Sequence, residues 1–341
     1  MLMIAIDGSQ GEGGGQVLRS SLGLSLVTGE PVRVRNIRAS RPKSGLMRQH
    51  LAAVRAAATI CNARVHGDSF GSREVELHPG AARPGEYEFS VGSAGSAALV
   101  LQTVLPPLMI AAAPSRLTLT GGTHNPWSPP FDFLVKSFLP LLGRMGASVS
   151  ARLVRPGFYP AGGGKFTVEI TPAAAGLKPL ELLERGELVS RRARAIVARL
   201  PRTIAERELA VVERQLGWAG DELAVEEVRD SAGPGNLLML ELASRHVTEV
   251  VTSFGRQGVP AETVAQQAVE EAQTYLAADV PVGPHLADQL LIPLAMAGGG
   301  RFRATAPTPH TTTNIAVIQQ FLNVTISAHP TEQHWEINVK G

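Results

Sequence analysis

The sequence predicts an α/β (α+β) fold: three repeated units, each of two helices and a four-stranded sheet, form a large domain beside a smaller inserted α/β domain. Two observations support this. The hydrophobic pattern changes in one recurring order, namely helix, strand, turn, helix and closing strands, near residues 1–91, 92–179 and 280–341. Residues 180–279 break that order and are numerous enough for a small core. We expect residues 1–179 and 280–341 to form the large domain, which carries the active site, and residues 180–279 the inserted domain.

Length and composition agree with two domains. At 341 residues the chain exceeds a usual single core, and 44% of its residues are hydrophobic. The net charge of +2 argues against binding nucleic acid by bulk charge, so such contacts should be local and made by arginine. The single cysteine, Cys61, excludes a disulfide framework and a cysteine metal cluster. Without a secretory signal or a bilayer-spanning apolar run, we expect a soluble cytoplasmic protein.

The first unit begins with a strand and a glycine-rich turn. We expect, in order, a strand at Met3–Asp7, a turn at Gly8–Gln16, a helix at Val17–Val27, a strand at Val32–Ile37, a basic turn at Ala39–Ser44, a helix at Leu46–Ile60 and strands near Arg73–Leu77 and Glu86–Val91.

The same order predicts the second and third units. The second has a helix from Gly92, a strand at Arg116–Thr120, a turn at 121–130, a helix at Phe131–Met145 and a hairpin of Ala147–Val154 with Lys165–Ile170. The third has helices at His285–Ala297 and His310–Phe321, with strands at Gly300–Thr305, Val324–Ser327 and Trp335–Val339. The inserted domain has strands at Val189–Leu200, Glu222–Val228, Leu237–Leu242 and Glu249–Phe254, with helices at Thr203–Gln215 and Pro260–Ala277.

The joint between strand and helix within residues 301–321 carries the clearest candidate for chemistry. Pro307 and Pro309 end the strand, and the side chains of Thr311–Asn314 offer oxygens that cap the following helix. His310 stands at this joint, where the unpaired N–H groups of the first turn disfavour imidazolium and would also receive a phosphate. A neutral imidazole is a nucleophile, so His310 is a candidate for covalent chemistry. The alternative is a turn residue, which a histidine after two prolines most often is.

The glycine run from Gly8 to Gln16 opens a helix, an arrangement that lets the backbone approach a phosphate closely. It is neither a P-loop, since no Lys-Ser/Thr closes it, nor a dinucleotide fingerprint. Glu12 lies among these glycines without apolar neighbours. We interpret it as a magnesium or manganese ligand, with a solvated turn residue as the alternative.

A basic cluster of Arg38, Arg41, Lys43 and Arg48 interrupts an otherwise apolar region. Most such clusters form a solvated surface, but this one leads into a helix start, which favours a phosphorylated ligand. If the three units pack about a common axis, the turns at 40–44, 121–130 and 306–310 would converge on one site. Gln102 is polar in an apolar helix and therefore needs a partner from the protein or a ligand.

Several segments together resemble the RNA 3'-terminal phosphate cyclase family. They occur in the family's order over nearly the whole chain: DGSQGEGGGQVLRS (Asp7–Ser20), SGLMRQHLAAV (Ser44–Val54), GSAGSAALVLQTVLP (Gly92–Pro106), RPGFYPAGGG (Arg155–Gly164), HLADQLLIPLA (His285–Ala295) and PHTTTNIAVIQQFL (Pro309–Leu322). The resemblance implies a large domain of three repeats similar to a translation initiation factor domain, with a smaller domain inserted before the last repeat. It implies an ATP-dependent conversion of an RNA 3'-phosphate into a 2',3'-cyclic phosphate, by way of AMP on a histidine.

The resemblance also implies site residues. His310 matches the nucleophile and Glu12 an acid associated with the metal, Mg or Mn, and with the ATP phosphates. Nucleotide contacts are implied for Gln102, Pro130, Phe133, His285, Leu286, Ala287, Asp288 and Gln289, and contacts with the triphosphate or the RNA end for Arg19, Arg38, Arg41, Arg48 and Gln49. His285 stands where relatives can have a tyrosine near the adenine, and His124 where an acid can occur, so nucleotide and metal preference stay open.

Two other interpretations remain. Cyclase-like relatives that lack the nucleophile serve in ribosomal RNA processing as structural or assembly factors, and the presence of His310 in an intact HTTTN segment argues against that role. An enzyme similar to the enolpyruvyl transferases also has repeated α/β units, but it has no use for the histidine. The expected partners are RNA 3'-phosphate ends and ATP without a membrane, and a homodimer is left open.

Overall fold

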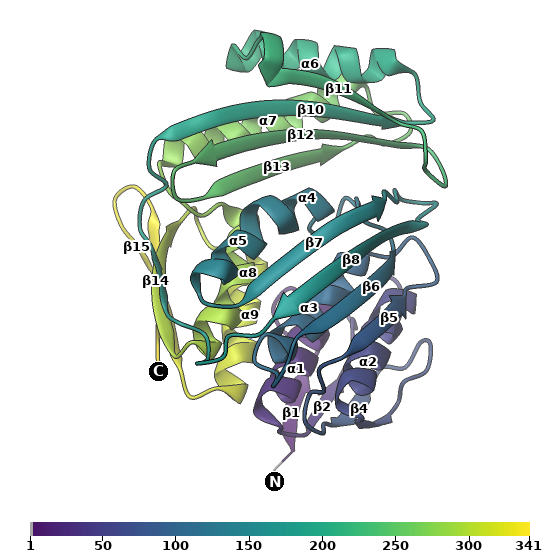
Figure 1. Ribbon diagram of the computed structural model, residues 1–341, viewed down its shortest axis with the longest axis vertical. Coiled ribbons are helices and arrows are strands. Elements are labelled where there is room, and N and C mark those ends of the chain that lie inside the picture. The colour runs from purple at the N-terminus through teal and green to yellow at the C-terminus, as the bar shows by residue number, and fades with distance from the viewer. Residues whose placement is uncertain (1–2) are drawn as a thin grey trace.

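Three sheets of the same topology and a fourth, different sheet build the computed structural model, which describes residues 3–341 (Figure 1). In each of the first three sheets the two leading strands are parallel, and a closing hairpin pairs antiparallel with the second of them. A helix connects the parallel strands, as a parallel pairing requires. The mixed α/β fold class predicted from the sequence is confirmed.

The first unit has strand order β1-β2-β4-β3. Its elements are β1 (Ile4–Asp7), α1 (Gly15–Thr28), β2 (Val32–Arg35), α2 (Arg48–Cys61), β3 (Arg64–His66) and β4 (Val75–His78). Helix α1 ends where Gly29 adopts a left-handed conformation with φ of 75°, which a glycine reaches without steric cost.

The second unit has strand order β5-β6-β8-β7. Its elements are β5 (Glu86–Ser90), α3 (Ala97–Leu108), β6 (Ser115–Gly121), α4 (Phe131–Phe133), a π-helical turn η1 (Leu134–Phe138), α5 (Leu139–Arg144), β7 (Ser148–Arg155) and β8 (Gly164–Thr171). Ser96 caps α3, because its Oγ accepts the backbone N–H of Leu99 at 3.3 Å.

The third unit is split by the inserted segment. Its elements are β9 (Leu180–Leu182), α8 (Pro284–Met296), β14 (Gly299–Ala304), α9 (Pro309–Phe321), β15 (Thr325–Pro330) and β16 (Trp335–Lys340), in the strand order β15-β16-β14-β9. The chain enters this sheet through β9 and leaves it for the inserted segment. It returns only at α8.

Strand pairing corrects the unit limits expected from the sequence. Residues 86–90 were expected to close the first unit, but β5 pairs with β6 and opens the second. The strand that completes the first sheet is β3, which the sequence analysis did not predict. Residues 180–182 were assigned to the inserted domain, yet β9 pairs with β14 of the third sheet.

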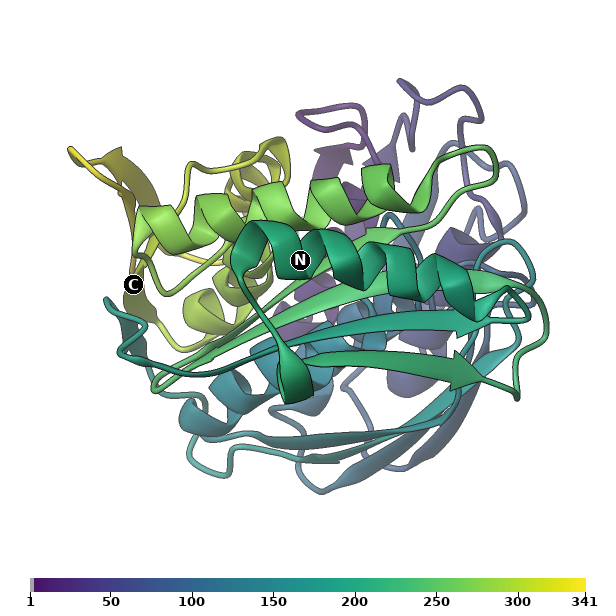
Figure 2. The same ribbon diagram turned by 90° about the horizontal axis from the view of Figure 1, so that it is seen from above.

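The inserted segment forms the fourth sheet, with strand order β11-β10-β12-β13. It consists of β10 (Leu188–Ala198), α6 (Arg202–Leu216), a 3₁₀ turn η2 (Gly220–Glu222), β11 (Leu223–Val228), β12 (Gly235–Ser244), β13 (Thr248–Phe254) and α7 (Ala261–Ala278). Figure 2 shows α6 and α7 side by side over one face of this sheet. Whether the segment folds alone as a domain stays a prediction.

Both faces of the fourth sheet are buried. Leu238, Leu240 and Leu242 of β12 belong to a cluster shared with α6 and α7, whereas Leu237 and Met239 belong to the main core. Because successive residues of a strand point to opposite faces, β12 is buried at nearly every position. The sheet therefore packs directly on the repeated units.

Helices of the three units meet beneath this sheet. Figure 1 shows α1, α3, α8 and α9 together between the small sheets, and α1 contacts both α3 and α9. This arrangement brings the N-termini of α1, α8 and α9, which come from the first and third units, to one region. Within residues 3–341 no helix combines the length and the hydropathy needed to cross a bilayer.

Candidate active site

A cleft of about 700 Å³ lies between the inserted sheet and the helices of the repeated units. Val250, Thr252 and Phe254, alternate residues of β13, line it from the inserted side. Most site residues predicted from the sequence line the same cleft: Glu12, Arg19, Arg38, Arg41, Gln49, Gln102, Pro130, Phe133, His285, Asp288, Gln289 and His310. The turns at 40–44, 121–130 and 306–310 each contribute lining residues, so they converge as expected.

Three predicted site residues lie elsewhere. The side chains of Leu286 and Ala287 are buried in the main core, with 0% and 2% exposure, so they face away from the cleft. They face inward because the polar residues of the same turn, His285 and Asp288, face the cleft. Arg48 is not among the lining residues, and its Nη1 donates to the carbonyl of Gly92 at 3.1 Å.

The start of α9 holds His310 at the cleft. The cap is Thr308, whose Oγ1 accepts the Thr311 N–H at 3.3 Å, and Pro309 occupies the first helical position. The expectation that Thr311–Asn314 cap the helix is therefore wrong, because the helix begins two residues earlier than Thr311. His310 is half-exposed and lies within the first turn.

Gln16, on the first turn of α1, connects His310 to Asp288. Its Nε2 donates to Oδ2 of Asp288 at 2.9 Å, which leaves its Oε1 to accept a hydrogen bond. Nδ1 of His310 lies 3.0 Å from that oxygen and donates to it. A neutral imidazole that carries its proton on Nδ1 has an unprotonated Nε2. The three side chains thus leave one histidine nitrogen with a free lone pair.

The charges around His310 favour its neutral form. Burial lowers the pKa of His310, Asp288 opposes this, and the positive charges of Arg19 and Arg41 lower the pKa further. Burial raises the pKa of Asp288 to about 6, so the carboxyl group is ionised at neutral pH. Asp288 can then accept hydrogen bonds from Gln16 and, at 3.0 Å, from Nε2 of Gln289.

Amide side chains extend this network into the cleft. Gln102 donates through its Nε2 to Oε1 of Gln289, so the partner that Gln102 needed is another cleft residue. Asn314 of α9 donates to the backbone carbonyl of Asp288 at 2.9 Å and accepts from Oγ of Ser20 at 2.7 Å. These bonds fix α1, α8 and α9 relative to one another.

Glu12 lies close to the histidine. Its Oε2 is 3.9 Å from Nδ1 of His310, and its other oxygen forms an ion pair with Arg41. Thr313 of α9 accepts the backbone N–H of Glu12 at 2.9 Å, which ties the glycine turn to the helix that carries His310. The turn needs glycine at Gly11 and Gly13, whose φ values are 57° and 63°.

The start of α1 lies too close to neighbouring side chains to carry a Cβ atom at Gly15. A Cβ atom at Gly15 would lie 2.4 Å from Nε2 of His50 and 2.8 Å from Nη1 of Arg19. Burial lowers the pKa of the Arg19 guanidinium to about 10, which leaves it charged, and burial with two nearby arginines lowers the pKa of His50 to about 3. Helix N–H groups, Arg19 and Arg38 here form a site suited to phosphate oxygens.

His285 also lines the cleft and has a carboxylate partner. Its Nε2 lies 3.2 Å from Oε1 of Glu271, and this hydrogen bond raises the pKa of His285. Beneath it, Glu249 is fully buried and accepts the N–H of Gly283 at 3.3 Å. Burial raises the pKa of Glu249 to about 8, so this carboxyl group is protonated at neutral pH.

His124 has a structural environment. It is 3% exposed, with Nδ1 2.8 Å from Oγ1 of Thr123 and Nε2 3.1 Å from Oδ2 of Asp132. Asp132 also forms an ion pair with Arg194 of the inserted sheet. Although burial acts in the opposite direction, these partners lower the pKa of Asp132 to about 2. His124 therefore supports a link between the second unit and the inserted segment.

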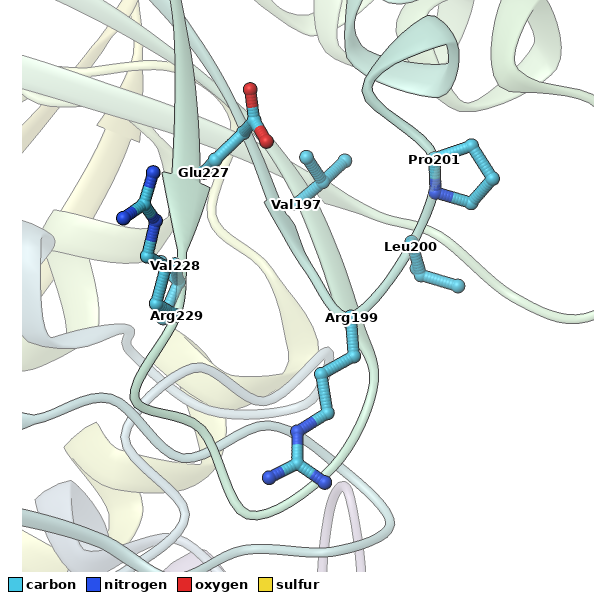
Figure 3. A pocket seen from close by; sticks show the side chains of 7 residues that line it. All are labelled: Val197, Arg199, Leu200, Pro201, Glu227, Val228 and Arg229. Atoms are coloured by element: carbon cyan, nitrogen blue, oxygen red, sulfur yellow. The ribbon is translucent and has the colours of Figure 1, made fainter.

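Other candidate sites are weaker. Residues 3–341 contain no group of three or more His, Cys, Asp or Glu side chains that could hold a metal ion by themselves. A second pocket of about 400 Å³ lies where β10 and β11 end, and Figure 3 shows the guanidinium of Arg199 extending away from the Glu227 carboxylate there. No residue predicted to act in the site lines that pocket.

Sequence reasoning missed several residues that the cleft brings together. Gln16 is the most important, and the available signal was a polar residue followed directly by the buried Val17 and Leu18 in the first turn of a helix. Asn314 was expected only to help cap its helix, and His50 was not assigned a role in the site. Their roles depend on contacts between different units, which spacing along one chain does not display.

Comparisons with known proteins agree with the geometry. Residues 10–328 match the family model described as RNA 3'-terminal phosphate cyclase. A protein of that name from Koribacter versatilis is 52% identical over 94% of this chain and 90% of its own length. The Ectopseudomonas mendocina protein of the same name is 52% identical over 95% and 94% of the two chains. The one from Salmonella enteritidis is 48% identical over 99% and 98%.

Proposed function

Because the chain belongs to the RNA 3'-terminal phosphate cyclase family, we propose that it uses ATP to convert RNA 3'-phosphate ends into 2',3'-cyclic phosphates, with AMP carried by His310. The observation that supports the histidine's role is the hydrogen bond from its Nδ1 to Gln16, which leaves Nε2 unprotonated in the cleft. Arginines and helix N–H groups around that nitrogen suit a triphosphate.

In the first step Nε2 of His310 attacks the α-phosphorus of ATP. A P–N bond forms, the bond from the α-phosphorus to the bridging oxygen breaks, and pyrophosphate leaves. The imidazole becomes positively charged as its lone pair is used, and the Nδ1–H to Gln16 bond spreads that charge toward Asp288. Arg19, Arg38 and Arg41 offset the charge of the phosphates.

In the second step an oxygen of the RNA 3'-phosphate attacks the same phosphorus. The P–N bond breaks, and AMP becomes joined to the RNA end through an anhydride. The neighbouring 2'-hydroxyl then loses its proton to solvent and attacks the 3'-phosphorus, and the anhydride bond breaks to release AMP. An oxygen of the free 3'-phosphate is a poor leaving group. Once AMP is joined to that phosphate, AMP itself leaves, which makes ring closure feasible.

The cleft offers separate regions for the base and the phosphates. Gln102 and Gln289 provide amide groups, and Pro130, Phe133 and His285 provide apolar or aromatic surface for a base. The phosphates would lie toward Arg19, Arg38 and the start of α1. Gln49 is held by the Ser96 N–H, which its Oε1 accepts at 2.8 Å, at the side of the cleft where an RNA end would meet the triphosphate.

A divalent metal fits this site only together with the nucleotide. Mg²⁺ in nucleotide sites is usually held by one or two carboxylates and by phosphate oxygens, and Glu12 provides one carboxylate next to the phosphate region. Such an ion would offset negative charge on the phosphates.

The proposal is tested by incubating the protein with ATP, magnesium and an RNA that is labelled next to its 3'-phosphate. We expect a product that resists phosphatase, and we expect His310→Asn to yield none while it retains the fold. Binding of the RNA without conversion by the unsubstituted protein would favour a non-catalytic processing factor. Conversion by the His310→Asn variant at the original rate would exclude the histidine as carrier.

A further inference from the structure

Two aromatic side chains stand exposed at the mouth of the cleft. Trp127 is 75% exposed and Tyr159 57%, and both line the cleft. The other large hydrophobic side chains that are exposed within residues 3–341, such as Phe70 and Val189, do not line it. The ring centroids of Trp127 and Tyr159 are 6.0 Å apart with an angle of 76° between planes. The edge-to-face contact keeps a face of the indole open to a ligand.

The loops that carry this pair are fixed to each other. The backbone N–H groups of Thr123 and His124 both donate to the carbonyl of Gly157, at 2.9 and 3.1 Å. Gly157 donates in return to Oγ1 of Thr123 at 2.9 Å, and His124 stacks on Phe158 with centroids 5.4 Å apart. The two aromatic rings therefore stand on a connected base, and a ligand would lose little loop entropy there.

A buried acceptor without a partner lies in the same loop. Asn125 lines the cleft and is 7% exposed; its Nδ2 donates to the carbonyl of Ala94 at 2.8 Å. Its Oδ1 has no hydrogen-bond partner among the described residues, and neither does Oγ of Ser128. Buried polar atoms normally have partners, so this loop is built for a ligand or water that can donate a hydrogen bond.

A nucleobase matches both features, because it has two flat faces for stacking and N–H groups on its edge. The RNA substrate is longer than the cleft, so its chain must leave over the rim. The region proposed for the base of ATP is a different part of the cleft, beside Gln102, Phe133 and His285. Charge supports a single-stranded ligand, since a net charge of +2 leaves stacking and local contacts to provide affinity.

We propose that Trp127 and Tyr159 stack a nucleobase near the 3' end of the RNA, with Asn125 accepting a hydrogen bond from that nucleotide. This inference rests on the proposed function and assigns the subsite through which its RNA leaves the cleft. Stacking tolerates all four bases, because each has a π-face. Purines bind more tightly here than pyrimidines, because they cover more of the indole.

Direct binding tests the subsite without any reaction. A short RNA with a 3'-phosphate is titrated into the protein without ATP, and tryptophan fluorescence is followed. The chain has 3 tryptophans; Trp218 is buried and Trp335, at the start of β16, does not line the cleft, so quenching by a stacked base reports chiefly on Trp127. We expect Trp127→Ala to weaken RNA binding, measured by filter retention, roughly 5- to 30-fold, and Trp127→Phe to restore most of it.

Controls separate stacking from general effects. Phe70→Ala removes an aromatic side chain that is 64% exposed outside the cleft, and it should leave RNA affinity unchanged. An abasic nucleotide, placed in turn at each of the last three positions, should abolish the quenching at one position only. Trp127 is 75% exposed, so its substitution should not unfold the chain; Tyr159→Ala provides a second variant in the same subsite.

The outcomes distinguish this inference from the proposed function. Unchanged RNA affinity in both Trp127→Ala and Tyr159→Ala overturns the subsite, even if the protein cyclises RNA. If these variants need a higher ATP concentration for labelling of the protein but keep their RNA affinity, the aromatic pair binds ATP. That result also overturns the subsite. Quenched binding by a protein that never cyclises RNA leaves the subsite standing and rejects the proposed function.

Discussion

Gln16 and His310 are joined by a hydrogen bond of 3.0 Å between Oε1 of the amide and Nδ1 of the imidazole. The amide is oriented by Asp288, which accepts its Nε2 at 2.9 Å. Together the two bonds determine which imidazole nitrogen carries the proton. The nitrogen of His310 that stays unprotonated is therefore selected by a residue of the first unit and a carboxylate of the third.

Gln16→Ala should slow adenylylation of the protein. Without the amide, the Nδ1 proton loses its acceptor and the imidazole can adopt the unproductive tautomer. The expected loss is about 10-fold, in line with the roughly 0.5–1.5 kcal/mol net contribution of one hydrogen bond to a half-exposed side chain. Gln16→Glu places a carboxylate beside Nδ1, which raises the pKa of His310. The acid limb of the pH–rate profile for adenylylation then moves to higher pH. A purely structural role for Gln16 would leave that limb in place.

The pH dependence of adenylylation should reflect a histidine that is neutral below its ordinary pKa of 6.5. Burial, followed by the charges of nearby arginines, lowers the pKa of His310, while Asp288 alone raises it. Protonation removes the lone pair, so the single-turnover rate should fall only below pH 6.5. Asp288→Asn removes the opposing charge and should shift the limb to lower pH, whereas Asp68→Asn at the surface should not. A limb above pH 6.5 would contradict this electrostatic account.

Glu12→Ala should weaken the dependence of adenylylation on a divalent metal while the fold stays intact. The concentration of magnesium for half-maximal labelling is expected to rise by at least about 10-fold, as for loss of a group that supports a metal. Glu74→Ala, which removes a half-exposed carboxylate outside the cleft, provides the matched control. The same magnesium dependence in Glu12→Ala and the control would remove Glu12 from metal binding.

Glu249 makes stability depend on pH. The folded carboxyl group has a pKa of about 8, against an ordinary value of 4.5, so the folded state holds a proton that the unfolded state has lost. The stabilisation of the folded state by this bound proton is complete below about pH 4.5 and disappears as the pH rises through about 8. Glu249→Gln should therefore raise the free energy of unfolding at pH 8 by about 1–3 kcal/mol, with little change near pH 4.5. Urea unfolding at both pH values measures this change in the free energy of unfolding, with Glu88→Gln as an exposed control. An equal effect of Glu249→Gln at the two pH values would contradict the prediction.

The repeated order of elements was visible in the sequence because α-helical and strand periodicities differ. Its phase was not. Each unit opens with a short strand that pairs only after a helix has crossed back, and β9 has only three residues, LEL. Strand β3, RVH, is likewise short and mostly exposed, so no apolar alternation marks it. The limits of each unit are set by pairing between strands that are distant in the sequence. The hydrophobic pattern along the chain does not show which strands pair.

The site shows the same division. His310, Glu12, Arg38 and Arg41 could be named from residue type and local chemistry, whereas Arg19 came only from the resemblance. The resemblance to a family assigned the stretch His285–Gln289 as a block, and burial then separated its members, since Leu286 and Ala287 lie in the core. Gln16 escaped notice because its role requires the first and third units to meet. Trp127 gave no signal, since a tryptophan in a turn is ordinarily expected to be buried.

The central claim is that Nε2 of His310 carries AMP. The most direct test is incubation with ATP labelled at the α-phosphate and with magnesium, followed by peptide mapping of the acid-labile, base-stable adduct and by nuclear magnetic resonance of the modified imidazole. The account predicts AMP on Nε2 of His310 and no adduct in His310→Asn. An adduct on Nδ1, on another residue, or undiminished in His310→Asn would contradict it.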